Sequence, residues 1–100
     1  MNALYRRILA AEPEQPDALH LLGVIAHQGG QHTVAAQYIH RAIALNPSDA
    51  RYYNNLGEVY RALHKMDDAL TCYRRALQLW PDFAEAHNSL GMALYQVGRM

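Results

Sequence analysis

Six histidines are the residues of this chain with the widest chemical range, because imidazole can bind a metal, move a proton or accept a hydrogen bond. His20 and His27 lie seven residues apart, which is close to two turns of one helix face. Zinc sites usually need tightly spaced ligands that include cysteines or histidines four residues apart, and no such pair occurs. We therefore expect no metal site. We expect the histidines to form hydrogen bonds on the surface or in a groove, and His20 and His27 to make binding pH-sensitive near pH 6–7.

Cys72 is the single cysteine, so the chain cannot form an internal disulfide, and no histidine has the spacing of a nucleophile pair. Asp67 and Asp68 begin a predicted helix, where carboxylates favour the positive end of the helix dipole. The sequence has no phosphate-binding loop and no Gly-x-Ser-x-Gly turn. We therefore predict no enzymatic activity and no cofactor. The lone thiol fits a reducing, cytoplasmic location.

Charge and hydropathy restrict the class of partner. Nine basic and nine acidic residues are interspersed, so the formal net charge at pH 7 is zero. A nucleic-acid-binding protein usually carries a basic patch, and no patch is evident. No apolar run approaches the ~18 residues that a membrane-spanning helix needs. Arg6 and Arg7 are not followed by the apolar stretch of a secretory signal. We expect protein or peptide partners, no nucleic acid and no membrane.

Most of the chain repeats with a period of 34 residues. The residues in register are Pro13, Pro47 and Pro81; Leu22-Gly23, Leu56-Gly57 and Leu90-Gly91; Arg7, Arg41 and Arg75; Ala35 and Ala69; and Ala42 and Ala76. A period of this size is typical of stacked repeat arrays. Such arrays work through extended surfaces, so the repeat indicates binding.

The apolar spacing and the turn residues predict an all-α fold. Tyr53, Leu56 and Tyr60 share one helix face, which we expect to be the core stripe of the middle unit. The six predicted helices cover residues 2–11, 16–29, 32–45, 49–63, 66–79 and 83–98. A glycine inside a helix costs ~1 kcal/mol relative to alanine, so glycines in register imply a repeated close contact. We expect Gly57 to lie opposite Ala69 and Gly23 opposite Ala35.

The middle unit carries an aromatic residue, Leu-Gly and Tyr on its first helix, then Ala, an aromatic residue and a closing Pro. These residues are Tyr53, Leu56-Gly57, Tyr60, Ala69, Tyr73 and Pro81. The unit resembles a tetratricopeptide repeat. The resemblance implies a right-handed superhelical stack of antiparallel helix pairs in one domain, 1–100. It would contain a half unit at 1–15, full units at 16–49 and 50–83, and a half unit at 84–100.

Tetratricopeptide superhelices line a concave groove with the first helix of each unit. The resemblance therefore implies a groove that holds a segment of a partner protein. The implied groove residues are His20, His27, Arg51, Asn54, Asn55, Glu58, Arg61, Asn88, Ser89, Met92 and Tyr95. The alternative is an ordinary solvated helix face.

Residues 54–57, Asn-Asn-Leu-Gly, and residues 88–91, Asn-Ser-Leu-Gly, are similar to the repeats of O-GlcNAc transferases and related bacterial repeat proteins. In that family an asparagine ladder holds extended peptide. Asn55 matches the ladder position, whereas Leu21 and Ser89 occupy it in the neighbouring units. Three functions stay open: a protein-binding scaffold, the recruiting arm of a larger enzyme such as a glycosyltransferase, and a self-associating adaptor.

Both ends of the chain carry half units. The last predicted helix has an apolar stripe of Leu90, Leu94 and Val97 with no later helix to cover it. Residues 1–13 match the second half of a unit, with Tyr5 in register. Repeat arrays normally end in a helix with a polar outer face. We expect either a piece of a longer array or a homo-oligomer formed through the end helices.

Overall fold

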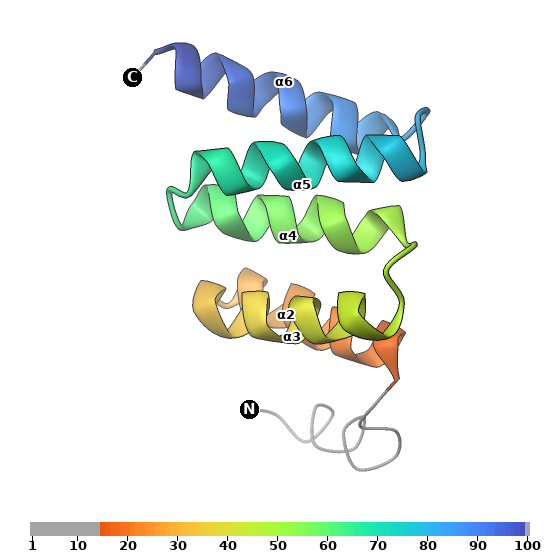
Figure 1. Cartoon of the computed structure of the whole chain (residues 1–100). Helices are drawn as coiled ribbons and strands as arrows, with labels where there is room; N and C mark the ends of the chain where they lie inside the picture. The colour runs from red at the N-terminus through yellow and green to blue at the C-terminus, as the bar shows by residue number, and fades with distance from the viewer. Residues whose placement is uncertain (1–14, 100) are drawn as a thin grey trace.

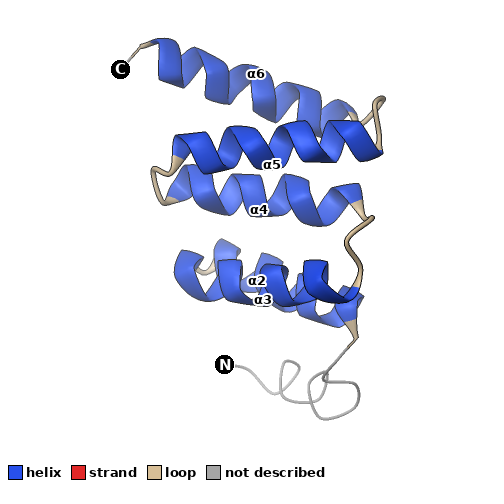
Figure 2. Ribbon diagram, in the orientation of Figure 1, coloured by secondary structure: helices blue, strands red, loops and turns tan. Residues whose placement is uncertain are grey.

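The computed structural model describes residues 15–99, and this part of the chain contains helices joined by short loops and no strand (Figure 2). The helices are α2 (Pro16–Gln28), α3 (His32–Leu45), α4 (Ala50–Ala62), α5 (Met66–Leu79) and α6 (Ala84–Gly98). Each begins and ends within one residue of its predicted bounds, which confirms the all-α prediction. The helix predicted at residues 2–11 lies outside the described residues.

Consecutive helices form a stack of pairs (Figure 1). α2 packs on α3 and α4 packs on α5, and these two pairs contain the most extensive contacts. α3 then joins the first pair to α4, and α5 joins the second pair to α6. The result is an elongated molecule with principal extents of 43 × 26 × 18 Å. The α2–α3 pair lies at one end and α6 at the other.

The first helices of successive units form an inner layer. α2 touches α4, and α4 touches α6, whereas within residues 15–99 α3 and α5 do not touch. Since the first helices converge and the second helices diverge, the surface formed by α2, α4 and α6 curves inward. We call this surface the concave face, and the surface formed by α3 and α5 the outer face.

Gly57 marks the closest approach within the α4–α5 pair. A Cβ atom at Gly57 would lie 2.5 Å from Cε1 of Tyr73, and Tyr73 is fully buried. The same contact occurs in the first pair, where a Cβ at Gly23 would lie 2.5 Å from Cγ1 of Ile39. The predicted close contact is therefore present. In the first pair the backbone oxygen of Ala35 lies 3.1 Å from the same Cβ position, so Gly23 lies opposite Ala35 as expected, with Ile39 still closer. In the second pair Tyr73 fills the contact, where we expected Ala69.

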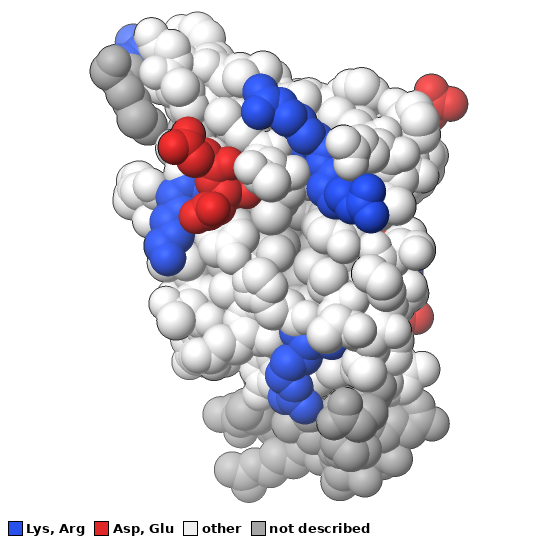
Figure 3. All heavy atoms as spheres, in the orientation of Figure 1, with Lys and Arg blue, Asp and Glu red and all other residues white. Residues whose placement is uncertain are grey.

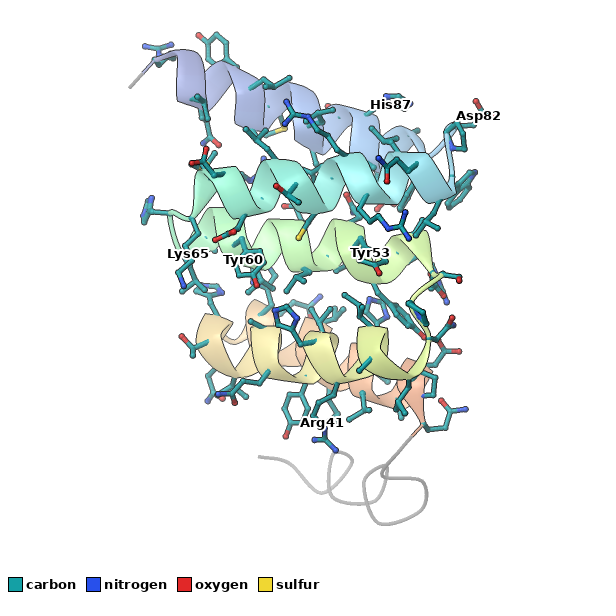
Figure 4. The ribbon with its side chains drawn as sticks, in the orientation of Figure 1. Arg41, Tyr53, Tyr60, Lys65, Asp82 and His87 are labelled. Atoms are coloured by element: carbon teal, nitrogen blue, oxygen red, sulfur yellow. The ribbon has the colours of Figure 1, made fainter. Side chains whose placement is uncertain are left out.

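The buried face of α4 is wider than the predicted stripe. Tyr52 and Val59 are fully buried, and both belong to a core cluster with Leu19 of α2 and Ile39 of α3. Tyr53 and Tyr60, which we expected in the core, are only partly buried and lie on the side toward α3 (Figure 4). The physical reason is that α4 contacts α2, α3, α5 and α6, so little of its surface is left exposed.

The turns between paired helices use the left-handed backbone region. Gly30 has φ of 82° in the first pair, and His64 has φ of 60° at the equivalent position of the second pair. Glycine adopts this conformation freely, whereas an L-residue with a Cβ is strained there by about 1–2 kcal/mol. His64 therefore stores strain at a turn that glycine would relieve.

The first prediction concerns the contact at Gly57. Gly57→Ala should lower the free energy of unfolding by about 1–3 kcal/mol, because the buried Tyr73 ring has no room to move away from a new methyl group. Gly91→Ala is the matched control, because no atom lies within 4 Å of its added Cβ. That variant should be neutral or gain up to ~1 kcal/mol of helix propensity. Urea unfolding of the monomeric chain would test both, and equal effects would contradict the packing argument.

A second prediction concerns His64. His64→Gly should raise the free energy of unfolding by about 1 kcal/mol, because glycine relieves the left-handed strain at this turn. The reverse substitution, Gly30→His, should lower it by a similar amount. Thermal unfolding followed by circular dichroism would measure both changes. A His64→Gly variant that is less stable than the wild type would show that the imidazole makes a contact that outweighs the strain.

Candidate functional site

Arg51 and Asp17 join α4 to α2 on the concave face. Nη2 of Arg51 lies 3.4 Å from Oδ1 of Asp17 and 2.6 Å from Oδ2 of Asp49. The hydroxyl of the buried Tyr52 donates a hydrogen bond to Asp17. The hydrogen bond from Arg51 holds the pKa of Asp49 below its usual range. Arg51, predicted as a groove residue, is thus engaged by carboxylates of its own chain.

Asp17 belongs to this site although we did not include it among the predicted site residues. It stands 34 residues before Arg51, so the two occupy equivalent positions of neighbouring repeats. Equivalent positions on stacked helices lie side by side. Opposite charges at such positions are therefore the sequence signal that could have predicted the pair.

His20 and Asn55 form a second link between α2 and α4. Nδ2 of Asn55 lies 2.7 Å from Nε2 of His20. An amide nitrogen only donates, so Nε2 accepts the bond and the imidazole is neutral. Burial lowers the pKa of His20, and the positive charge of Arg51 lowers it further. The structure therefore brings together these two predicted groove residues and holds the histidine uncharged.

His27 pairs with His32 at the turn between α2 and α3. Their Nδ1 atoms are 2.9 Å apart. One ring must donate and the other accept, so this contact exists only while at least one of the two is neutral. Burial lowers the pKa of His27, as does His32, whereas the negative charge of Glu58 raises it. The second predicted groove histidine is therefore also a hydrogen-bonding residue, and it lies within the electrostatic reach of α4.

Glu58 connects the concave face to the core. Its Oε2 accepts a hydrogen bond of 2.7 Å from Nη2 of Arg61, and its Oε1 accepts one of 2.9 Å from the hydroxyl of Tyr73. Burial raises the pKa of the Tyr73 phenol, and the nearby Glu58 carboxylate adds to this effect. Nη1 of Arg61 is buried and has no hydrogen-bond partner among the described residues.

Asn54 and Ser89 require a correction. We expected both on an open groove surface, but Asn54 is 3% exposed and Ser89 is 8% exposed. Asn54 lies one helical turn after Ala50, which packs against Phe83 and Ala86 where α4 meets α6. The approach of these helices covers both side chains. Oδ1 of Asn54 is buried without a hydrogen-bond partner in the part of the chain that the structure describes.

Apart from Arg51 on α4, the exposed residues of the predicted site lie on α6. Met92 is 49% exposed and Tyr95 is 64% exposed. With the exposed Asn88 they border a hollow of about 550 Å³. The lining residues of this hollow are His87, Asn88, Gly91, Met92, Tyr95 and Gln96. This region offers amide, thioether and phenol groups to an incoming partner.

A second hollow, of about 410 Å³, opens on the outer face between α3, α4 and α5. Its lining residues are His40, Ile43, Tyr53, Leu56, Tyr60, Asp68, Thr71, Cys72 and Arg75. Nε2 of His40 lies 2.7 Å from the hydroxyl of Tyr60. Burial raises the pKa of the Cys72 thiol to about 12, so the thiol is not a nucleophile at neutral pH. Sequence reasoning missed this hollow, because its lining comes from three helices without a shared motif.

The charged side chains on the side of the molecule drawn in Figure 3 stand in separate groups with uncharged surface between them. Residues 15–99 contain no cluster of three or more metal-binding side chains. None of the helices within the same residues is long and apolar enough to cross a membrane.

Comparisons with known proteins identify the fold family. A model described as TPR repeat matches residues 57–98, and one described as anaphase-promoting complex, cyclosome, subunit 3, matches residues 3–76. The chain is 28% identical to a peroxisomal targeting signal receptor of Eremothecium gossypii, covering 94% of this chain and 17% of the receptor. The curated relatives are therefore several times longer than this chain.

Two solved structures agree with these matches. An O-GlcNAc transferase of Thermobaculum terrenum superposes with a TM-score of 0.87 at 39% identity, over 90% of this chain and 17% of that chain. The first TPR of Spaghetti (RPAP3), bound to the HSP90 peptide SRMEEVD, superposes with a TM-score of 0.88 at 28% identity, over 94% and 75% of the two chains. Together with the 34-residue period and the glycine contacts, these matches show that the chain belongs to the tetratricopeptide-repeat family.

Proposed function

We propose that this chain is a protein-binding module, without catalysis of its own, that holds a segment of another protein on its concave face. The family membership supports a binding role, and a structure with the same fold is a complex with a peptide. The observation that carries the proposal is the position of unpartnered polar groups on α4 next to exposed side chains on α6. A binding surface needs both features, because the first gives hydrogen bonds and the second gives contact area.

The unpartnered groups match the chemistry of a peptide backbone. Oδ1 of Asn54 can accept a hydrogen bond from a backbone N–H, and Nη1 of Arg61 can donate one to a carbonyl. Both atoms are buried and make no hydrogen bond within residues 15–99. A buried polar atom without a partner destabilises the free protein by about 1–3 kcal/mol. A partner that reached these atoms after a small side-chain movement would recover that free energy.

The two halves of the concave face differ. Between α2 and α4 the polar side chains are already paired with one another, through the Arg51–Asp17 and His20–Asn55 contacts. Between α4 and α6 the exposed Asn88, Met92 and Tyr95 have no comparable set of partners across the groove. We therefore place the partner segment against α4 and α6, with an apolar side chain against Met92 and Tyr95.

The partner class differs from the acidic HSP90 peptide of the Spaghetti complex. Tetratricopeptide modules that clamp a C-terminal carboxylate use lysines, an arginine and asparagines at set groove positions. Asn55 is the one match here, whereas His20, Val24, Glu85 and Ser89 stand at the other positions. We expect the peptide SRMEEVD to bind weakly or not at all.

The alternative is that this chain is the recruiting arm of a larger enzyme. It would use the same binding surface, and a catalytic domain would belong to the same polypeptide. Its support is the similarity to the O-GlcNAc transferase, of which this chain covers 17%. The gene sequence downstream of codon 100 would distinguish the two, because a glycosyltransferase domain there would make this chain an arm. Cytoplasmic localisation remains a prediction from the single cysteine.

The third prediction tests the concave face. Peptides selected from a random display library against the wild-type chain should bind the double variant Asn54→Ala with Asn88→Ala at least about tenfold more weakly. Each lost hydrogen bond contributes ~0.5–1.5 kcal/mol, and 1.4 kcal/mol corresponds to a factor of ten. Isothermal titration calorimetry on the monomeric chain would give the affinities. Circular dichroism should show the same helical content as the wild type.

The matched control lies on the outer face. The double variant His40→Ala with Arg75→Ala changes two residues that line the outer hollow and should bind the selected peptides normally. If this control lost affinity and the Asn54–Asn88 variant kept it, the partner would bind the outer hollow and the proposal would be wrong. The same outcome would leave the family membership untouched.

The fourth prediction is acid sensitivity of the α2–α4 contact. The folded-state pKa of His20 is lowered by burial, so the unfolded chain takes up a proton more readily than the folded chain. The stability from neutral His20 is therefore complete above its ordinary pKa of about 6.5 and is lost as the pH falls through the folded-state pKa. The sign is the same for His27, whose pKa is also lowered.

We expect the melting temperature to fall between pH 7.5 and pH 5 in the wild type, and to fall less in a His20→Gln with His27→Gln variant. His87, an exposed residue of α6, gives the matched control, and His87→Gln should retain the wild-type dependence. A wild-type melting temperature that is constant over this pH range would contradict the prediction. Differential scanning calorimetry at a series of pH values would measure it.

A further inference from the structure

The outer hollow between α3, α4 and α5 is lined by two tyrosines that have no counterpart in the first unit. Tyr53 and Tyr60 lie seven residues apart on one face of α4, which is two turns, or about 10 Å. The residues 34 positions earlier are Leu19 and Ala26, and both are buried. The second unit therefore adds two phenol rings at positions where the first unit has only aliphatic core residues.

Hydrogen bonds to the first unit hold both rings in place. The hydroxyl of Tyr53 donates a bond of 2.9 Å to the carbonyl oxygen of Pro47. The hydroxyl of Tyr60 lies 2.7 Å from Nε2 of His40, and the two rings meet edge to face. Both tyrosines lie on the side of α4 toward α3 (Figure 4). The walls of the hollow are thus fixed before any ligand arrives, which lowers the entropic cost of binding.

The interior of the outer hollow suits a flat apolar group. Leu56 lies on α4 between the two tyrosines and is buried, as is Cys72 of α5, while Ile43 of α3 is partly buried. The volume of about 410 Å³ is within the range of about 300–1,000 Å³ that small-molecule sites occupy. An aromatic ring gains more from such a space than an aliphatic chain does, because it can also pack against the tyrosine rings.

The charged residues of the hollow select the sign of the ligand. Arg75 and Asp68 lie seven residues apart, two turns along α5. The guanidinium of Arg75 lies over the Tyr53 ring, 5.8 Å from its centroid, and donates a bond of 3.1 Å to Oε1 of Gln78. No carboxylate pairs with it in the part of the chain that the structure describes. Asp68 lies in the first turn of α5, where the helix dipole already stabilises its charge.

We propose that the outer hollow binds a small aromatic carboxylic acid, with its ring over Leu56 between the two tyrosines and its carboxylate on Arg75. A guanidinium has a planar set of N–H donors that matches a carboxylate. Asp68 repels the carboxylate from the other end, so the two charges fix the orientation of the ligand. The hollow lies on the outer face, and the proposal does not depend on the partner segment of the concave face.

Three naphthalene derivatives that differ in charge test this assignment. Naphthylacetate, naphthylacetamide and naphthylethylamine would be titrated into the isotope-labelled 100-residue chain and followed by nuclear magnetic resonance. Naphthylacetate should shift the amide signals of the residues that line the outer hollow. It should bind about fivefold or more tightly than the amide, because a charge-assisted hydrogen bond is stronger than a neutral one. The amine should bind more weakly than the acid.

Two variants test the role of individual residues. Arg75→Gln should lower the affinity for naphthylacetate about fivefold and leave that for naphthylacetamide unchanged, because only the acid uses the positive charge. Arg74→Gln is the matched control, because Arg74 is the exposed neighbour on α5, does not line the hollow and should have no effect. Thr71→Trp should abolish binding of both compounds, since Thr71 is an exposed lining residue and an indole there would fill the space.

Several results would overturn the proposal. Absence of signal shifts up to the solubility limit of all three compounds would show that the hollow does not admit a ring. Shifts confined to α6 would place the ring on the concave face. An amine that binds more tightly than the acid would make Asp68 the selecting charge. The variant Asn54→Ala with Asn88→Ala should bind naphthylacetate normally, so failure of the concave-face proposal and failure of this one give different results.

Discussion

The close approach of paired helices at Gly23 and Gly57 is the contact on which the rest of the structure depends. Without a side chain on the first helix, the second helix can place Ile39 or Tyr73 directly against its backbone. Tyr73 also extends its hydroxyl to Glu58, which in turn holds Arg61. The side chain that packs the pair therefore also positions two charged groups of the concave face. Packing and site geometry are coupled through one residue.

The repeat period predicted the helices well and the burial less well. A 34-residue register gives the helix bounds, which recur along the chain, and the glycine contacts, which occur in both complete helix pairs. The burial of the adjacent tyrosines of α4 is harder to predict. The Leu-Gly register favoured Tyr53 as the core residue, but Tyr52 is the one that is fully buried. Tyr52 faces α2, and a contact between units depends on the superhelical packing rather than on the pattern within one unit.

Contacts between units also decide which predicted site residues are hydrogen-bonded to each other and which are buried. His20 and Asn55 were both predicted on the groove helices, yet their hydrogen bond joins positions 35 residues apart and does not follow from the repeat alone. Asn54 and Ser89 are buried because α4 and α6 approach each other, which a helical wheel of one helix cannot show. The outer hollow has no sequence signal, since three helices each contribute a few residues to it.

The charge distribution of the concave face bears on how a partner is selected. The Arg51 guanidinium is opposed by Asp17 and Asp49, and the Arg61 guanidinium by Glu58, while His20 is neutral. With opposite charges paired at short distance and a formal net charge of zero, the face has little long-range field to attract a charged partner. We infer that selection at the α4–α6 end depends on short-range hydrogen bonds and on the fit of an apolar side chain. A surface of this kind discriminates by the cost of leaving its amide and guanidinium groups unpaired, which is large only for partners that come close enough to exclude water.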